Sequence, residues 1–138
     1  MSNQNVAAVL YTINLESIAR FYGQVAGMRV QRTDTDHVIL EKEGFRLIVH
    51  QIPEEYAANV RIESPPRIRE SGAIKLSLPV VSISNARQTA AQLGGCVYDA
   101  DHEWEYEGSS VCDGWDPDGN VFQLFQPALD VQEDRGRG

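Results

Sequence analysis

The stretch Gly114–Gln126, GWDPDGNVFQLFQ, combines a tight turn with a segment typical of a β-strand. Within DPDGN, Pro117 presets the φ angle at the second turn position, Asp116 can cap the turn, and Gly119 supplies a left-handed residue. The stretch is a poor calcium loop, because glycine comes too early after Asp116 and Pro127 stands where a bidentate acid is needed. The motif therefore predicts a turn that opens a strand.

The same order of predicted elements occurs in both halves of the chain. In the first half, a strand-like run and a helical pattern are followed by three strand-like runs, at residues 6–15, 15–27, 28–33, 37–43 and 45–52. In the second half, the corresponding patterns lie at residues 73–81, 82–95, 96–108, 109–115 and 120–126. Residues 53–72, which contain three prolines and several charges, predict a connector.

Capping residues mark the ends of both predicted helices. Asn14 is a plausible N-cap for the first helix, and either Ser82 or Ser84 for the second. Gly27 and the pair Gly94–Gly95 stand where helices commonly end. These signals fix the limits of two short helices, one in each half.

The two halves align as an internal duplication. A shift of 68 residues places Gly27 on Gly95, and a shift of 75 places Gly44 on Gly119, so the second half holds seven extra residues within 99–110. We predict an α+β fold of two tandem βαβββ modules, at about 5–53 and 73–127, joined by a linker at 54–72. Since one module could not bury both faces of its sheet, residues 1–127 should form one domain, with a flexible tail at 128–138.

The composition excludes several classes of function. A formal net charge of -8, with acids spread along the chain, disfavours binding to nucleic acid or to an anionic membrane surface. The first ten residues do not resemble a secretory signal, and no apolar run is long enough to span a bilayer. Cys96 and Cys112 are too few for a disulfide framework or a zinc quartet. We therefore expect a cytoplasmic protein with reduced thiols.

Paired βαβββ modules with DPDGN opening the last strand resemble the vicinal oxygen chelate superfamily, which comprises glyoxalases, bleomycin-resistance proteins and extradiol dioxygenases. The segments that carry the resemblance are NLESIARFYGQVAGM (14–28) and VCDGWDPDGNVFQL (111–124). The resemblance implies curved mixed sheets around a cleft, and often a homodimer. It says less about function, because this fold hosts lyases, epimerases, dioxygenases and non-catalytic drug-binding proteins.

The resemblance implies four metal-ligand positions, which in this chain fall on Ala7, Ile48, Lys75 and Gln123. A divalent cation requires carboxylate or imidazole donors, so this quartet does not form a competent site. Moving the opening strands by two residues keeps the same face but offers only Val9 with Ser77, or Asn5 with Ala73. We predict no metal and no cofactor. A displaced site built from His50, His102 and an acid is the alternative.

Strand alternation predicts the side chains that line the cleft. In DADHEWEYEG (99–108), acids alternate with His102, Trp104 and Tyr106, which predicts an aromatic wall opposite a solvated acidic face. The complete set of predicted cleft residues is Arg46, Ile48, His50, Lys75, His102, Trp104, Tyr106, Trp115, Gln123 and Phe125. Cationic, amide and apolar groups together suit a small organic ligand with an anionic or carbonyl handle.

Three functions are compatible with these residues. The first is metal-independent binding of a hydrophobic or aromatic small molecule, with a likeness to the bleomycin-resistance branch. The second is a lyase or isomerase that uses either a displaced metal or Lys75 and His50 as acid and base. The third is an interaction module with a vestigial cleft. In each case a homodimer is expected, because open sheet edges gain from being covered.

Overall fold

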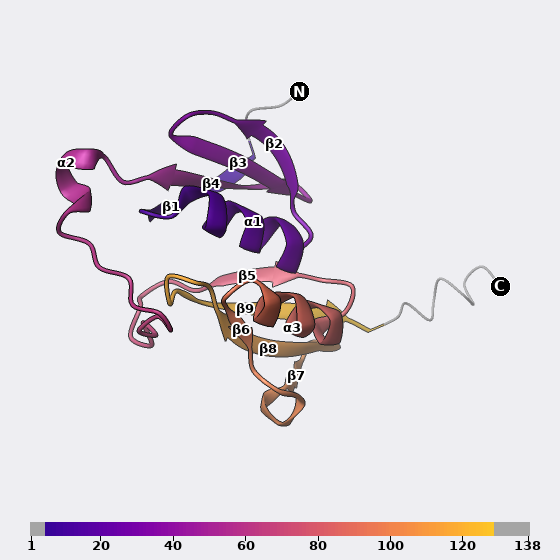
Figure 1. Cartoon of the computed structure of the whole chain (residues 1–138). Helices are drawn as coiled ribbons and strands as arrows, with labels where there is room; N and C mark the ends of the chain where they lie inside the picture. Colours follow the sequence, from indigo (N-terminus) through magenta and orange to yellow (C-terminus); the bar gives the residue numbers. More distant parts are fainter. Residues whose placement is uncertain (1–4, 129–138) are drawn as a thin grey trace.

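The computed structural model describes residues 5–128, and its first module is a four-stranded mixed sheet with one helix (Figure 1). The elements are β1 Val6–Thr12, α1 Leu15–Val25, β2 Arg29–Thr33, β3 His37–Lys42 and β4 Phe45–Gln51. The strands lie in the order β1-β4-β3-β2, with β1 parallel to β4 and the other neighbours antiparallel.

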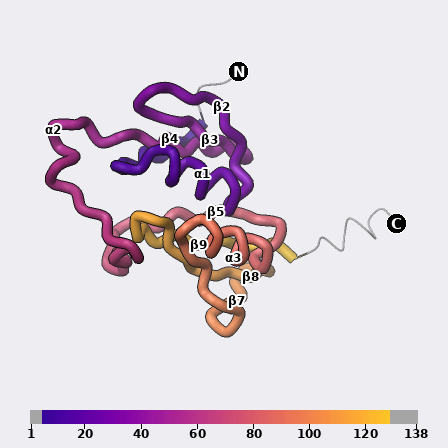
Figure 2. Tube along the Cα trace, viewed as in Figure 1, coloured from indigo at the N-terminus to yellow at the C-terminus, as the bar shows by residue number. Residues whose placement is uncertain are grey.

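The second module repeats this arrangement with two small additions. Its elements are β5 Leu76–Pro79, α3 Ile83–Gln92, β6 Cys96–Val97, η1 Ala100–His102, β7 Trp104–Tyr106, β8 Ser109–Trp115 and β9 Val121–Pro127. The strand order is β5-β9-β8-β6, and β7 pairs with β8. The linker carries the short helix α2, Glu54–Ala57, and runs along one side of both modules (Figure 2). The predicted α+β fold with a duplicated element order is confirmed.

Both main helices begin where their caps predict. Ser82 Oγ accepts a 3.0 Å hydrogen bond from the backbone N–H of Asn85, so it caps α3. Asn14 precedes α1, but its side chain does not cap the helix and instead donates to Asp118 at 3.3 Å. Gly27 follows α1 with a φ of 68°, a left-handed conformation that glycine adopts without strain.

Helix α1 lies between the first sheet and the second module, and its apolar side packs on both (Figure 1). Phe21 and Tyr22 are buried, and the centroids of their rings lie 5.8 and 5.9 Å from the centroid of Phe122 in β9. Burying one phenylalanine stabilises a fold by about 1.5–3 kcal/mol. The two modules therefore share one hydrophobic core.

The DPDGN motif forms the turn between β8 and β9, as predicted. Gly119 adopts a φ of 87°, and its N–H donates to the carbonyl of Asp116 at 2.7 Å. The buried carboxylates of the motif also reach the first module: Tyr22 Oη donates to Asp116 and Thr12 Oγ donates to Asp118, both at 2.7 Å. The turn is therefore an inter-module contact as well as a chain reversal.

The prediction of one strand over residues 96–108 is wrong. The segment contains β6, the 3₁₀ turn η1 and β7, so the predicted alternation of acids and aromatics applies only to the three residues of β7. Arg87 accounts for part of this, since its guanidinium donates to the carbonyl of Tyr98 at 2.7 Å and to Glu103 at 2.6 Å, which holds the chain between them close to α3.

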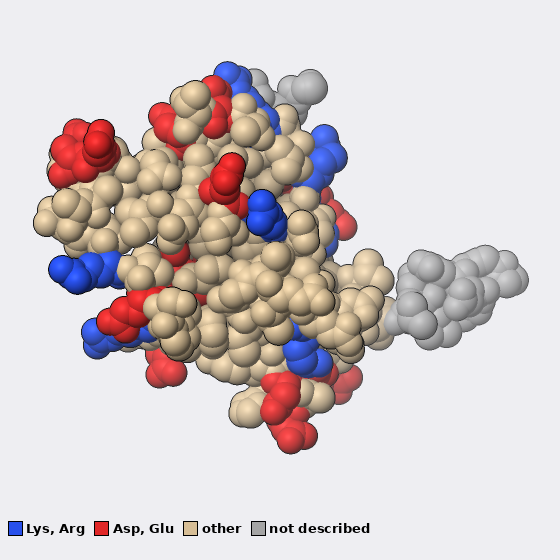
Figure 3. All heavy atoms as spheres, viewed as in Figure 1, with Lys and Arg blue, Asp and Glu red and all other residues tan. Residues whose placement is uncertain are grey.

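Charged side chains of both signs are interspersed on the face shown in Figure 3. Among residues 5–128, no helix has the length and apolar character needed to cross a bilayer.

Candidate functional site

The second sheet has one face in the core and one face that points away from it. Leu78, Cys112 and Leu124 belong to the core, so the alternating side chains lie on the opposite side. The register aligns these outward residues into rows across β5, β9 and β8. The open face of the second sheet, as we call it, consists of Ser77, Val111, Asp113, Gln123 and Phe125.

A hollow of about 230 Å³ lies on this open face. Its polar lining comes from Ser77, Ser109, Gln123 and the carboxylate of Glu107, and its apolar lining from Val111 and Phe125. Tyr106 of β7 stands at its edge. A small cavity with apolar walls and a few fixed polar groups is typical of small-molecule sites.

Gln123 is fixed by a neighbouring strand. Its Nε2 donates to Ser77 Oγ at 2.8 Å, and the two residues are direct partners in the parallel pairing of β5 with β9. This contact orients the amide, whose carbonyl oxygen can then accept a hydrogen bond from a ligand. The sequence predicted Lys75 opposite Gln123, but β5 begins one residue after Lys75 and its register places Ser77 there.

Lys75 lies at the polar end of the same face. Its Nζ is 3.2 Å from Asp113 Oδ1, and Asp113 is the cross-strand partner of Gln123. A second hollow of about 500 Å³ is lined by Lys75, Asp113 and Tyr98 among others, and it shares no lining residue with the first. Lys75 is about two-fifths exposed, and its ammonium group is engaged in the ion pair with Asp113.

The predicted cleft residues of the first module lie on another sheet. Arg46, Ile48 and His50 alternate along β4 with the core residues Leu47 and Val49, so they share the side of the first sheet that faces away from α1. We call this side the open face of the first sheet. Since α1 separates the first sheet from the second module, one chain does not bring the two open faces together (Figure 1).

Arg46 carries an unsatisfied donor. Its Nε is buried and has no hydrogen-bond partner within residues 5–128. A buried guanidinium N–H without a partner costs free energy, and an anionic or carbonyl group placed against it would recover that cost.

The register decides which residues occupy the superfamily's metal positions. Ile48 is the cross-strand partner of Val9, and Gln123 is the cross-strand partner of Ser77. Val9 and Ser77 are the residues obtained when the opening strands of the sequence alignment are moved by two positions. These four side chains offer one hydroxyl and one amide, without a carboxylate or an imidazole. They do not fit the metal that the superfamily binds there.

The predicted aromatic residues take different positions. Trp104 pairs with Val111 and Tyr106 with Ser109, and both rings are largely exposed beside the open face of the second sheet. Trp115 lies at the far end of β8, half-buried and paired with Val121.

His102 is not part of the aromatic wall. It lies in η1, where its Nδ1 is 2.7 Å from Asp99 Oδ1. It therefore does not join His50 in the alternative metal site. The residues that join His50 are His37 and Asp36.

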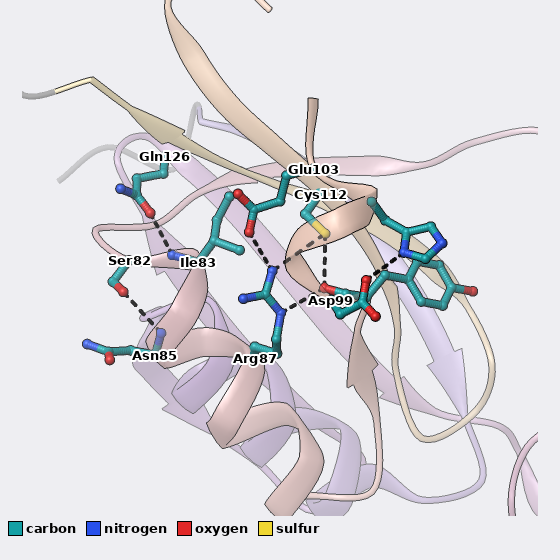
Figure 4. A network of polar contacts seen from close by, with 10 residues as sticks. Ser82, Ile83, Asn85, Arg87, Asp99, Glu103, Cys112 and Gln126 are labelled. Carbon is teal, nitrogen blue, oxygen red and sulfur yellow. Dashed lines mark hydrogen bonds and ion pairs between the residues drawn. The ribbon is translucent and has the colours of Figure 1, made fainter. Parts of the chain in front are cut away.

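A polar network joins α3 to β8 and to the segment around Glu103 (Figure 4). Arg87 of α3 reaches Glu103 and the carbonyl of Tyr98, and Cys112 Sγ donates to the same carbonyl at 3.2 Å. The hydrogen bond to Glu103 raises the pKa of Arg87, and burial raises the pKa of Cys112. The Cys112 thiol therefore stays protonated, which makes it a structural group rather than a nucleophile.

The sequence model of the glyoxalase-like domain matches residues 7–125, nearly the whole described chain. The chain belongs to the glyoxalase-like domain family. With this family it falls in the vicinal oxygen chelate superfamily, as its turn motif and duplication predict. Comparison with curated proteins gives no significant match.

Solved structures agree with this membership. A glyoxalase/bleomycin resistance protein/dioxygenase family enzyme from Burkholderia phytofirmans PsJN is 17% identical with a TM-score of 0.63, covering 87% of this chain and 95% of its own. A glyoxalase-related enzyme from Fulvimarina pelagi is 19% identical with a TM-score of 0.61, covering 91% and 88%. A glyoxalase/bleomycin resistance protein from Albidiferax ferrireducens T118 is 12% identical with a TM-score of 0.60, covering 88% and 96%. At these identities the likeness establishes the fold alone.

Some residues of the open face of the second sheet and of the cluster around His50 were not predicted from the sequence. Val111 and Asp113 were not predicted, although alternation along 109–115 places them on one side of the strand. Asp36 and His37 were also missed, because their proximity to His50 arises from the antiparallel pairing of β3 with β4. No local spacing signals such a contact.

Proposed function

We propose that this glyoxalase-like protein binds a small organic molecule on the open face of its second sheet. The observation that carries the proposal is the hollow in which the Gln123–Ser77 pair lies opposite Phe125 and Val111. An aromatic or hydrophobic body fits the apolar side, and a carbonyl or anionic handle fits the amide and the nearby Lys75.

The proposed binding does not depend on a metal at the superfamily's ligand positions. Val9, Ile48, Ser77 and Gln123 occupy those positions, and their donors are too few and too weak for a divalent cation. The Gln123 amide serves instead as a neutral hydrogen-bonding group for the ligand.

The proposal includes a homodimer. Val9 and Tyr11, on the open face of the first sheet, and Tyr106, beside the open face of the second, are exposed apolar or aromatic side chains. Because α1 separates the two sheets of one chain, a second copy could set its first sheet against this hollow.

A second candidate function is a lyase or isomerase with a displaced metal. One observation favours it, namely that two histidines and an aspartate lie together at the end of the open face of the first sheet. In the proposed dimer this cluster would border the ligand site.

Anilinonaphthalene sulfonate is a suitable first probe, because it joins an aromatic body to an anionic handle. We expect saturable fluorescence enhancement by the untagged protein, unchanged by a chelator. Phe125→Ala and Tyr106→Ser should each weaken the probe's Kd about tenfold, equivalent to about 1.4 kcal/mol of lost contact.

The matched control is Tyr56→Ser. Tyr56 in α2 is 60% exposed and Tyr106 is 63% exposed, so the two substitutions remove equally accessible rings. Equal weakening by both, or no effect of Phe125→Ala, would refute the proposed site. Loss of probe binding with the chelator would refute its independence from metal.

A further inference from the structure

The clearest cluster of chemically active side chains outside the proposed ligand site lies where β3 begins and β4 ends. His37 and His50 are direct cross-strand partners in the antiparallel pair, so their side chains are on the same side of the sheet. Their imidazole rings are stacked, with centroids 5.7 Å apart and an interplanar angle of 9°. The side they share is the open face of the first sheet.

The backbone sets the protonation of one of these rings. His50 Nδ1 lies 2.9 Å from the carbonyl oxygen of Gln51, an acceptor, so Nδ1 carries the proton. The lone pair is then on Nε2, which points toward Asp36, with Oδ2 at 3.9 Å. A histidine whose other nitrogen donates to a backbone carbonyl has the arrangement typical of metal ligands.

Asp36 completes the cluster. Its Oδ1 forms a hydrogen bond of 2.8 Å with His37 Nδ1. One ligand atom from each of Asp36, His37 and His50 lies within 4.8 Å of the others. A neighbouring carboxylate, Asp34, is held by Arg32 Nε at 2.9 Å, and the same oxygen lies 3.9 Å from His37 Nε2, so it adds negative charge beside the cluster.

We propose that Asp36, His37 and His50 bind one divalent transition-metal ion. Two imidazoles and one carboxylate form a set that suits zinc, cobalt, nickel or iron and disfavours magnesium and calcium. Donor atoms around such an ion stand about 3.3 Å apart, given metal–ligand distances of about 2.0–2.2 Å. The proposed site therefore requires rotation of the exposed Asp36 carboxylate and of the two partly exposed imidazoles, which brings the ligand atoms closer than the 4.8 Å of the unbound cluster.

The site is open to solvent on one side. The side chain of Asp36 is 62% exposed, and three protein ligands leave at least one position for water or a small ligand. An open position distinguishes a reactive or exchangeable metal site from a structural one, which is closed by four protein ligands.

The inference is separate from the proposed small-molecule site. The cluster belongs to the first module and shares no residue with the hollow around Gln123 in the second. Metal binding to this cluster needs only the residues of one chain, so it can be tested apart from the proposed ligand site and the proposed dimer. The metal inference departs from the metal-free expectation of the sequence, which considered His50 only with His102.

The test uses untagged protein, stripped with a chelator and titrated with zinc or cobalt. We expect one zinc ion per chain by competition with a chromophoric chelator, and a visible cobalt absorption band of low-symmetry coordination. His37→Gln, His50→Gln and Asp36→Asn should each weaken the zinc Kd by at least about tenfold. A loss of about tenfold is already found when a residue that only orients a metal ligand is replaced.

His102→Gln is the matched control. His102 also has an aspartate partner at 2.7 Å, through Asp99, but no second histidine in its cluster. It should leave zinc affinity unchanged. Absence of stoichiometric binding by the wild type, or equal weakening by His102→Gln, overturns the proposal. Unfolding midpoints of each variant separate loss of a ligand from loss of the fold, and Asp36→Asn changes an exposed side chain that the core does not need.

Discussion

The hydroxyl of Tyr22 in the first module donates a 2.7 Å hydrogen bond to the buried carboxylate of Asp116 in the second. Asp116 also accepts from the backbone N–H groups of Asp118 and Asn120. Burial, and then the adjacent Asp116 charge, raises the pKa of Tyr22 well above its ordinary value. This contact, together with those of Thr12 and Asn14 with Asp118, joins the turn motif of the second module to the first.

Tyr22→Phe should lower the free energy of unfolding by about 1–3 kcal/mol, because Asp116 loses a buried partner. The substitution should also change the dependence on pH. Above about pH 10 the unfolded chain releases the Tyr22 proton while the folded chain keeps it, so wild-type stability falls as pH rises. In Tyr22→Phe, the free energy of unfolding should therefore fall less steeply as the pH rises.

Urea unfolding at neutral pH and at about pH 10.5 measures both effects. Tyr56→Phe, which changes an exposed tyrosine in α2, is the control and should leave both quantities unchanged. A variant Tyr22→Phe that kept the wild-type slope above pH 10 would contradict the role given to this hydroxyl.

At the level of helices and strands, sequence patterns within a few neighbouring residues predicted the elements that depend on contacts between near neighbours. The periodicity of 15–27 and the caps at Asn14 and Ser82 placed both helices, because helix formation depends on contacts within a few residues. Turn chemistry placed the β8–β9 connection for the same reason. The segment 96–108 departed from its alternating pattern, because Arg87 holds it through long-range hydrogen bonds.

The candidate site was predicted less well than the fold. Alternation placed Gln123 and Phe125 on the same side of β9, but it did not fix which residue of β5 faces Gln123. A shift by two residues leaves the side of the sheet unchanged, so the pattern fitted Lys75 and Ser77 equally. The pairing of His37 with His50 depends on the register between β3 and β4. The residues around each histidine do not reveal that register.

Adding a methyl group at each of two glycines should change the stability of the protein in opposite directions. A Cβ at Gly114 in β8 would lie 2.3 Å from the carbonyl oxygen of Cys96 and 2.9 Å from the ring of Phe122. A Cβ at Gly23 in α1 would make an ordinary contact of 3.7 Å with the carbonyl oxygen of Met28. Gly114→Ala should therefore destabilise the protein by about 1–3 kcal/mol, and Gly23→Ala should stabilise it by about 0.5–1 kcal/mol.

Urea denaturation of both variants checks the signs. The two substitutions add the same methyl group, so an opposite change in midpoint isolates the local packing. Equal changes in the two variants would contradict the close approach of β6 to β8.

For the whole molecule, the main consequence of the fold is that its two open faces lie on different sheets, with α1 between the first sheet and the second module (Figure 1). A cleft bounded on both sides therefore requires a second copy. The edge strand β1 carries exposed Val9 and Tyr11 on the open face of the first sheet, an apolar strip suited to an interface.

The proposed dimer predicts a mass of about 31 kDa in solution, twice the 15.4 kDa of the chain, by light scattering after gel filtration. Val9→Lys should shift the protein to the monomer, because it places a charge at the centre of the strip. Val81→Lys is the control, since Val81 is 93% exposed and lies outside the open faces. A wild-type monomer, or dissociation by Val81→Lys, would contradict this arrangement.

The measurement that tests the central claim most directly is mapping of probe-induced shifts in a heteronuclear NMR spectrum of the labelled protein. With anilinonaphthalene sulfonate, we predict saturable shifts centred on the backbone amides of Ser77, Val111, Gln123 and Phe125, the residues around the hollow. Shifts confined to the first module or to the linker, or an unchanged spectrum at saturating probe, would contradict a ligand site on the open face of the second sheet.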